Sequence, residues 1–248
     1  MAEAGRRSVG YPDGGLYVLR AEGIYAIARA GDTGMRGLGG HAHNDQLSFE
    51  LSGFGRPLII DPGAYLYTAA PEERNRFRST AFHSTLQIDD AEQNDLGSTY
   101  LFSLPDRTRT EVLAWEPDVP RLRARHHGYE GLPEPATHSR SIALEGKAAM
   151  MVVEDELDSV GSHRLLWTFP LAGGEPRIDR GWCLVEIGGV DLAIRAPDGV
   201  ELTIEPGFVS PSYGVRRPTP FLRGRGRSAP GLTRWRWELL LGLPPSDS

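Results

Sequence analysis

The stretch Gly39-Gly40-His41-Ala42-His43-Asn44-Asp45-Gln46-Leu47-Ser48-Phe49-Glu50 sets two imidazoles two residues apart at the start of a strand pattern. Its second half alternates apolar with polar residues, which is typical of a half-buried β-strand. Residues two apart on an extended backbone point to the same side, so His41 and His43 are predicted to share one pocket. The stretch therefore predicts a sheet with a polar site at its edge.

Strand signals continue on both sides of this stretch. Residues 16–20 and 24–28 are predicted to form a hairpin, and residues 69–77, with Thr68 as a possible cap before Pro71, suggest a short helix. Many short strands separated by Gly and Pro predict stacked antiparallel sheets. We expect an all-β fold, a single large antiparallel multi-stranded β-sandwich over residues 1–248. The further predicted strands are 47–51, 58–60, 85–88, 110–114, 121–126, 139–144, 150–157, 164–169, 184–187, 192–195 and 235–241.

Composition excludes several classes of protein. The formal charge of −6 argues against a nucleic-acid partner attracted by overall charge. No apolar run is long enough to insert in a bilayer, and residues 1–7 have no apolar core behind their arginines, so they do not form a secretory signal. Cys183 is the only cysteine, which excludes internal disulfides and Cys-based zinc fingers.

Two residues downstream of the histidine pair complete a set of candidate metal ligands. Asp61 lies in the turn signal Ile60-Asp61-Pro62-Gly63, and a third imidazole follows at His83. Zinc favours neutral imidazole nitrogen and carboxylate oxygen in tetrahedral geometry. His43, Asp61 and His83 would fill three positions of a zinc site, or of another divalent cation site. His41 would then be free for chemistry.

An arginine triplet, Arg74, Arg76 and Arg78, precedes His83. Guanidinium groups bind carboxylates and sulfates in a bidentate manner. The triplet is therefore a candidate for binding an anionic substrate. The alternative is that it lies on a solvated loop.

Residues 15–93 resemble the C-terminal β-sheet domain of the heparinase II/III-like family of polysaccharide lyases. Three segments carry the resemblance: the His-x-His-x-Asp strand of residues 41–51, the Asp-Pro-Gly-x-Tyr turn of residues 55–65, and Thr80-Ala81-Phe82-His83-Ser84-Thr85-Leu86. The rest of the chain matches only in its β character and length.

The resemblance assigns roles to these positions. It implies that His43, Asp61 and His83 bind a metal, usually zinc, and that His41 faces the substrate cleft and assists catalysis. It also implies that Asn44 and Asp45 orient the imidazoles by hydrogen bonds. For Asp45 a turn cap at the strand entry is an equal alternative.

Tyrosines follow the aspartate turn. Tyr65 is a candidate substrate-binding residue, and Tyr65 and Tyr67 are both expected in the core or on the cleft wall. His126, His127, His138 and His163 match no motif position, and we expect them to be surface or strand histidines without a ligand role.

The reaction that the resemblance implies is β-elimination on a uronate-containing polysaccharide such as heparan sulfate or alginate. A base removes the proton on carbon 5, an acid protonates the departing oxygen on carbon 4, and positive charge stabilises the enolate-like intermediate. His41 could act as base, as acid or as partner of the carboxylate. Zinc could polarise the carboxylate, but we favour a structural role in tying three loops together.

Enzymes of this family also carry an N-terminal helical toroid that supplies further catalytic groups. This chain has no helical region for a toroid, so we expect one wall of an active site and weak turnover, with a separately encoded toroid as a possible partner. The resemblance suggests the periplasm or cell envelope, with the cytoplasm as the alternative. The rival functions are a non-catalytic carbohydrate-binding or metal-scaffold module and, less favoured, a cupin-type metalloenzyme with Glu50 as a ligand.

Overall fold

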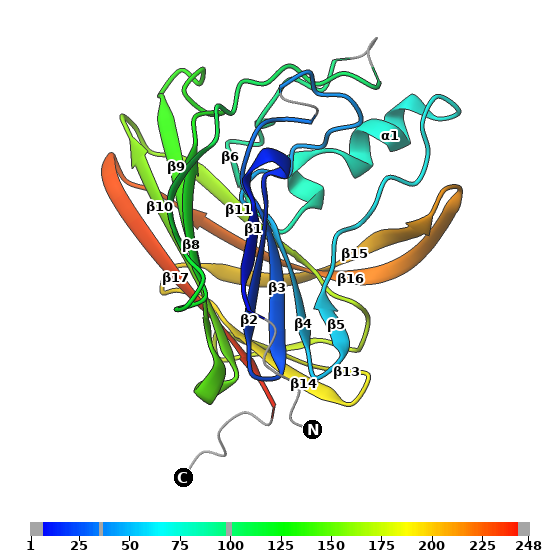
Figure 1. The fold of residues 1–248 in the computed structure, drawn as a ribbon. Helices are drawn as coiled ribbons and strands as arrows, with labels where there is room; N and C mark the ends of the chain where they lie inside the picture. The colour runs from blue at the N-terminus through cyan, green and yellow to red at the C-terminus, as the bar shows by residue number, and fades with distance from the viewer. Residues whose placement is uncertain (1–6, 35–36, 98–100, 243–248) are drawn as a thin grey trace.

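The computed structural model describes residues 7–34, 37–97 and 101–242, whose strands form three antiparallel sheets (Figure 1). The first sheet is a meander in chain order. It contains β1 (Val9–Tyr11), β2 (Leu16–Ala21), β3 (Ile24–Arg29), β4 (Phe49–Gly53) and β5 (Arg56–Ile59).

The largest sheet has eight strands, and the smallest has four. In spatial order the eight are β12 (Arg177–Asp179), β13 (Trp182–Ile187), β14 (Val190–Arg195), β17 (Gly231–Leu241), β10 (Met150–Ser159), β9 (Ala136–Glu145), β8 (Arg121–His126) and β7 (Glu111–Glu116). The four are β15 (Glu201–Ser212), β16 (Val215–Arg227), β11 (Arg164–Pro170) and β6 (Leu86–Ile88). The prediction of an all-β antiparallel sandwich is confirmed.

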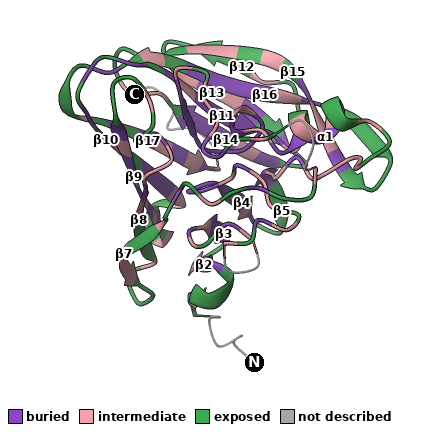
Figure 2. Ribbon diagram, turned by 90° about the horizontal axis from the view of Figure 1, so that it is seen from above, coloured by how far each residue is buried: buried purple, intermediate pink, exposed green. Residues whose placement is uncertain are grey.

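The three sheets share one hydrophobic core. Trp167 of β11 packs against Trp237 of β17 with ring centroids 5.6 Å apart, and both rings are fully buried. Phe169 of β11 contacts Phe49 of the first sheet at 6.1 Å, so one aromatic cluster joins all three sheets. Buried residues lie in the middle of the molecule, whereas α1 is exposed on one side and buried at Arg74 and Phe77 (Figure 2).

In the part of the chain that the structure describes, helical structure is limited to short segments. The α-helix α1 (Pro71–Phe77) begins with a proline in its first turn, and the 3-10 segments are η1 (Pro12–Gly14), η2 (Thr80–Phe82) and η3 (Gly146–Ala148). Ala70 is the N-cap of α1, so the expected cap at Thr68 is wrong. None of the described helices has the length and apolarity needed to cross a bilayer.

Two sequence-based expectations fail at positions of irregular backbone. His41 and Leu47 have φ of +58° and +60°, so the histidine pair lies in a turn and β4 begins only at Phe49. The argument from an extended backbone was therefore wrong. Strands β15 and β16 were not predicted, because prolines such as Pro206 and Pro218 interrupt their sequence pattern.

The loops that carry the motif meet at one end of the first sheet. In Figure 1 the loop after β3, the loop after β5 and α1 all lie at the end of this sheet that is farther from the two termini. The hairpin of β15 and β16 reaches the same region, close to α1. Residues far apart in sequence can therefore build one site here.

Candidate functional site

The centre of the site is a histidine–aspartate pair at the end of β5. The Nδ1 atom of His83 lies 2.7 Å from Oδ2 of Asp61, and the His83 ring is fully buried. The other oxygen of Asp61 accepts a hydrogen bond of 2.8 Å from the backbone N–H of Gly63, which fixes the carboxylate in its turn. The ring of His43 lies with its centroid 5.2 Å from that of His83. The structure thus brings together the three residues expected to bind metal.

The three groups differ in charge. Burial, followed by the charge of His83, lowers the pKa of His43 to about 3, so this imidazole is neutral. Burial alone would lower the pKa of His83, but the charge of Asp61 and its hydrogen bond raise it. Burial also disfavours the Asp61 carboxylate, yet His83 holds its pKa at about 2. An anionic aspartate therefore faces an imidazole that readily carries a proton.

Arg74 of α1 lies directly against this cluster. Its Nη1 donates to Nε2 of His43 over 2.7 Å, and its side chain is fully buried. Because a guanidinium only donates, Nε2 of His43 must be the acceptor, which agrees with a neutral ring protonated at Nδ1. Arg74 is therefore an internal partner of the site rather than a solvated anion receptor.

The donor chemistry of the cluster fits zinc, whereas its present arrangement is hydrogen-bonded. Two imidazoles and a carboxylate are typical zinc ligands, and Nε2 of His83 is buried with no hydrogen-bond partner. However, Nδ1 of His83 is occupied by Asp61, and Nε2 of His43 by Arg74. Within residues 7–34, 37–97 and 101–242, no three His, Cys, Asp or Glu side chains are arranged as a ligand shell.

His41 is exposed beside this cluster. Its backbone N–H donates to the carbonyl oxygen of Phe102 over 3.1 Å, and its ring makes edge contacts with Tyr67 and Phe102 at 5.6 and 5.4 Å. A surface hollow of about 630 Å³ is lined by His41, His43, Arg29 and Asp45. His41 therefore faces solvent on the rim of a hollow that extends to His43.

The neighbours of His43 do not orient the imidazoles as expected. The side chain of Asn44 donates to Oε2 of Glu92 over 2.7 Å and to the carbonyl of Asn94, and Asp45 lies 3.9 Å from Nε of Arg29. No hydrogen bond joins either residue to a described imidazole. Asp61 orients His83 instead.

Glu92 is a residue of the site that the sequence analysis missed. Its Oε2 accepts hydrogen bonds from the side chain of Asn44 and from the backbone N–H and hydroxyl of Thr80, all within 2.8 Å. These bonds tie the loop that carries His43 to η2, which immediately precedes His83. Only the three-dimensional contacts mark it, because a glutamate after a strand carries no motif signal.

The remaining candidates lie around the edge of the cluster. Arg78 is buried and donates to the carbonyl oxygens of Leu96, Leu101 and Ser103. Its side chain therefore stabilises the loop that contains these carbonyls. Arg76 is exposed, beside Glu73 at 3.6 Å, and it alone of the triplet lies on the surface as a solvated residue would. Tyr65 is half-buried against Phe77 at 5.3 Å.

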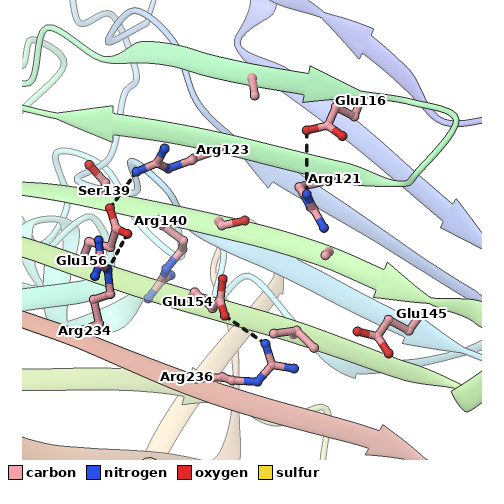
Figure 3. Close-up of a pocket in the computed structure, with 14 residues that line it drawn as sticks. Glu116, Arg121, Arg123, Ser139, Arg140, Glu145, Glu154, Glu156, Arg234 and Arg236 are labelled. Atoms are coloured by element: carbon pink, nitrogen blue, oxygen red, sulfur yellow. Dashed lines mark hydrogen bonds and ion pairs between the residues drawn. The ribbon is translucent and has the colours of Figure 1, made fainter.

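A second hollow, of about 540 Å³, lies on the open face of the eight-stranded sheet (Figure 3). Arginines and glutamates alternate across it as ion pairs. Arg123 and Arg234 both contact Glu156, at 2.7 and 2.8 Å, and Arg236 contacts Glu154 at 2.9 Å. Most of the charges in this hollow are therefore paired with one another rather than open to a ligand.

A family model described as Heparinase II/III-like, C-terminal matches residues 3–238. A heparin-sulfate lyase of Bacteroides stercoris is 24% identical over 222 residues, which make up 84% of this chain and 30% of that protein.

Solved structures show the same fold. The heparan sulfate lyase HepC of Pedobacter heparinus superposes with a TM-score of 0.80 at 21% identity, over 97% of this chain and 37% of that one. A structure of heparinase III gives a TM-score of 0.78 at 18% identity, over 97% of this chain and 38% of that one. The chain thus spans about a third of the length of these relatives.

Proposed function

This chain belongs to the heparinase II/III-like C-terminal family, and we propose that it is the β-sheet domain of a polysaccharide lyase. The proposed substrate is a uronate-containing acidic polysaccharide, cleaved by β-elimination. The relatives named as heparin-sulfate and heparan sulfate lyases favour a heparan-like chain over an alginate-like one. The observation that carries the proposal is the exposed His41 beside the half-buried His43 and Asp61 and the fully buried His83.

His41 is the proposed proton-transfer residue. In β-elimination the carbon 5 proton passes to a base, a double bond forms between carbons 4 and 5, and the oxygen on carbon 4 departs and gains a proton. An imidazole can take or give a proton near neutral pH. His41 is exposed, and its ring is held by Tyr67 and Phe102, so it can meet a sugar without rearrangement.

His43, Asp61 and His83 are the proposed metal ligands, with zinc as the expected ion. Nε2 of His83, which is buried without a hydrogen-bond partner, would be the nitrogen open to the ion, whereas Nε2 of His43 accepts from Arg74 and Nδ1 of His83 is bonded to Asp61. When bound, the ion would supply fixed positive charge and hold the three loops together.

A second domain is proposed to complete the cleft. The relatives are about three times as long as this chain, which leaves room for a helical toroid with further catalytic groups. The open hollow beside His41 is consistent with a cleft closed from the other side. We therefore expect the isolated chain to bind acidic polysaccharide weakly and to turn it over poorly.

The test is the absorbance of unsaturated uronate released from heparin, heparan sulfate, alginate and hyaluronan, with the chain assembled with a helical domain. Replacing His41 with alanine should lower turnover about 100- to 10,000-fold. The control, His127→Ala, changes a histidine held by Glu130 and Glu111 away from the site and should leave turnover intact. Unchanged turnover in His41→Ala would instead indicate a non-catalytic binding or scaffold module.

A further inference from the structure

The hairpin of β15 and β16 has no role in the site described so far, yet its tip is fixed onto it. The tip is a two-residue turn, Tyr213-Gly214, and Gly214 has φ of +73°. The backbone N–H of Gly214 donates to the carbonyl of Tyr65 over 2.8 Å, and that of Ser210 donates to the carbonyl of Pro62 over 2.7 Å. The tip is thus hydrogen-bonded to the loop that follows Asp61.

Two further contacts keep the tip in place. Nη1 of Arg216 lies 2.7 Å from Oε2 of Glu73, which anchors the hairpin to α1. Gly63 approaches the hairpin so closely that a Cβ there would lie 2.3 Å from the carbonyl oxygen of Ser210. The position of the tip is therefore set by backbone contact and not only by side chains.

The tip adds a third ring to an aromatic row that ends at His41. Tyr213 stacks on Tyr67 at 5.6 Å with an angle of 30° between the rings, and Tyr67 contacts Phe102 at 5.3 Å. His41 makes edge contacts with Tyr67 and Phe102. We call Tyr67, Phe102 and Tyr213 the aromatic row.

The row is exposed at both ends. Tyr213 is 62% exposed and Phe102 is 41% exposed, although both are large apolar side chains. Exposed apolar surface beside a polar cleft is typical of a binding site. The guanidinium of Arg216, which is paired with Glu73 and lies over the ring of Phe208, is next to the same tip. An aromatic face beside a cation fits a sugar ring that carries an acidic group.

We propose that Tyr213 stacks on a pyranose ring of an acidic polysaccharide, next to the sugar that His41 reaches. This inference rests on the proposed function, since it names a subsite of the same cleft. The apolar C–H face of the pyranose would cover the free face of Tyr213. Because the tip is already docked, little conformational entropy would be lost on binding.

The test measures binding of a heparan sulfate hexasaccharide and of an alginate hexamer to the chain by calorimetry. Tyr213→Ala should weaken the binding of the sugar that the chain recognises about tenfold, the effect of leaving roughly 60 Å² of apolar surface uncovered. Tyr213→Phe keeps the ring and should bind within about twofold of the unchanged chain. The loss should persist at high salt, because stacking is not screened as ion pairs are.

Phe54→Ala is the matched control. Phe54 is 56% exposed in the turn after β4, at the other end of the first sheet, and its removal should leave binding unchanged. If Tyr213→Ala binds like the unchanged chain, the subsite is refuted and the proposed function stands. If the unchanged chain binds neither oligosaccharide, both proposals fail. A loss in Tyr213→Ala that Tyr213→Phe shares would also refute stacking.

Discussion

Two clusters in this protein contain the same residue types, two histidines, one aspartate and one arginine, but they differ in completeness. The site cluster has His43, His83, Asp61 and Arg74, and it leaves buried nitrogens of His83 and Arg74 without partners. The core cluster consists of His126, His138, Asp155 and Arg140 on β8, β9 and β10, and all four are buried.

In the core cluster hydrogen bonds run in one direction. The backbone N–H of Gly128 donates to Nδ1 of His126, whose Nε2 lies 3.2 Å from Nδ1 of His138. Nε2 of His138 in turn contacts Oδ1 of Asp155 at 2.6 Å. This order assigns one donor and one acceptor to each neutral ring, so neither imidazole has a free nitrogen.

Asp155 is also paired by Arg140, through bonds of 2.7 and 3.0 Å, and accepts from Nε1 of Trp167. Buried polar networks of this kind stabilise a fold when every group is satisfied. The contrast teaches that residue type alone does not separate a structural cluster from a functional one. Buried groups without partners near a surface hollow distinguish the site cluster from the core cluster.

The largest expected effect is on the free energy of unfolding, and it differs between Asp155 of the core cluster and Asp61 of the site cluster. Asp155→Asn should lower the free energy of unfolding by about 3–5 kcal/mol, because it leaves the buried Arg140 charge uncompensated. Asp61→Asn changes a carboxylate that is 38% exposed and should lose about 1 kcal/mol. Urea unfolding measures both values. Equal losses in the two variants would show that the site aspartate is as structural as the core one.

The next effect concerns metal. His83→Ala should weaken zinc binding roughly 100-fold or more, since even changing a partner of a ligand commonly weakens binding tenfold to a hundredfold. His163→Ala is a close control, because Nδ1 of His163 also contacts an aspartate, Asp89 at 2.6 Å, and its Nε2 is also unpartnered. Competition titration with a zinc chelator measures both. Similar affinities in the two variants would place the metal elsewhere.

Lowering the pH should reduce the free energy of unfolding through the two histidines of the core cluster, by less than the substitution Asp155→Asn does. Burial lowers the pKa values of His126 and His138 below those of the unfolded chain, so the unfolded state binds more protons as the pH falls below about 6.5. Their stabilising effect is complete above that pH and declines as the pH falls below it. In His126→Gln part of this decline should be absent. An unchanged pH slope of the unfolding free energy would show that the rings are not held neutral.

The smallest effect is expected one residue from Asp155, on the opposite face of β10. Glu156 pairs with Arg123 and Arg234 on the open face shown in Figure 3. Glu156→Gln should lower the unfolding free energy by less than about 1 kcal/mol, because exposed ion pairs contribute little. Thermal unfolding at low and high salt measures this change. A loss comparable to that of Asp155→Asn would show that these ion pairs on the open face stabilise the sheet.

The motif and strand patterns predicted the class of fold and the three residues that meet in the site. The sandwich followed from alternating short strands, and His43, Asp61 and His83 do come together. The reason given for the histidine pair was nevertheless wrong, because His41 has a left-handed backbone. Motif spacing reports which residues converge, but not the backbone path that brings them there.

The features that the sequence did not predict depend on long-range contacts. Arg74 and Arg78 were candidates for binding an anionic substrate, with a solvated loop as the alternative, but both are buried and donate to His43 and to loop carbonyls. The expectation of plain surface or strand histidines missed that His126 and His138 are linked in the core. Tyr213 escaped notice because its hairpin contains prolines.

Two hydrogen bonds from β9 make the motif segment dependent on the eight-stranded sheet. Nη1 of Arg140 donates to the carbonyl oxygens of Leu47 and Ser84, each at 2.8 Å, just after His43 and His83 in the chain. A peptide ending at residue 93 would contain every motif residue but would lack Arg140 and its two hydrogen bonds. Grafting the motif onto another scaffold would therefore require a buried guanidinium from a neighbouring sheet.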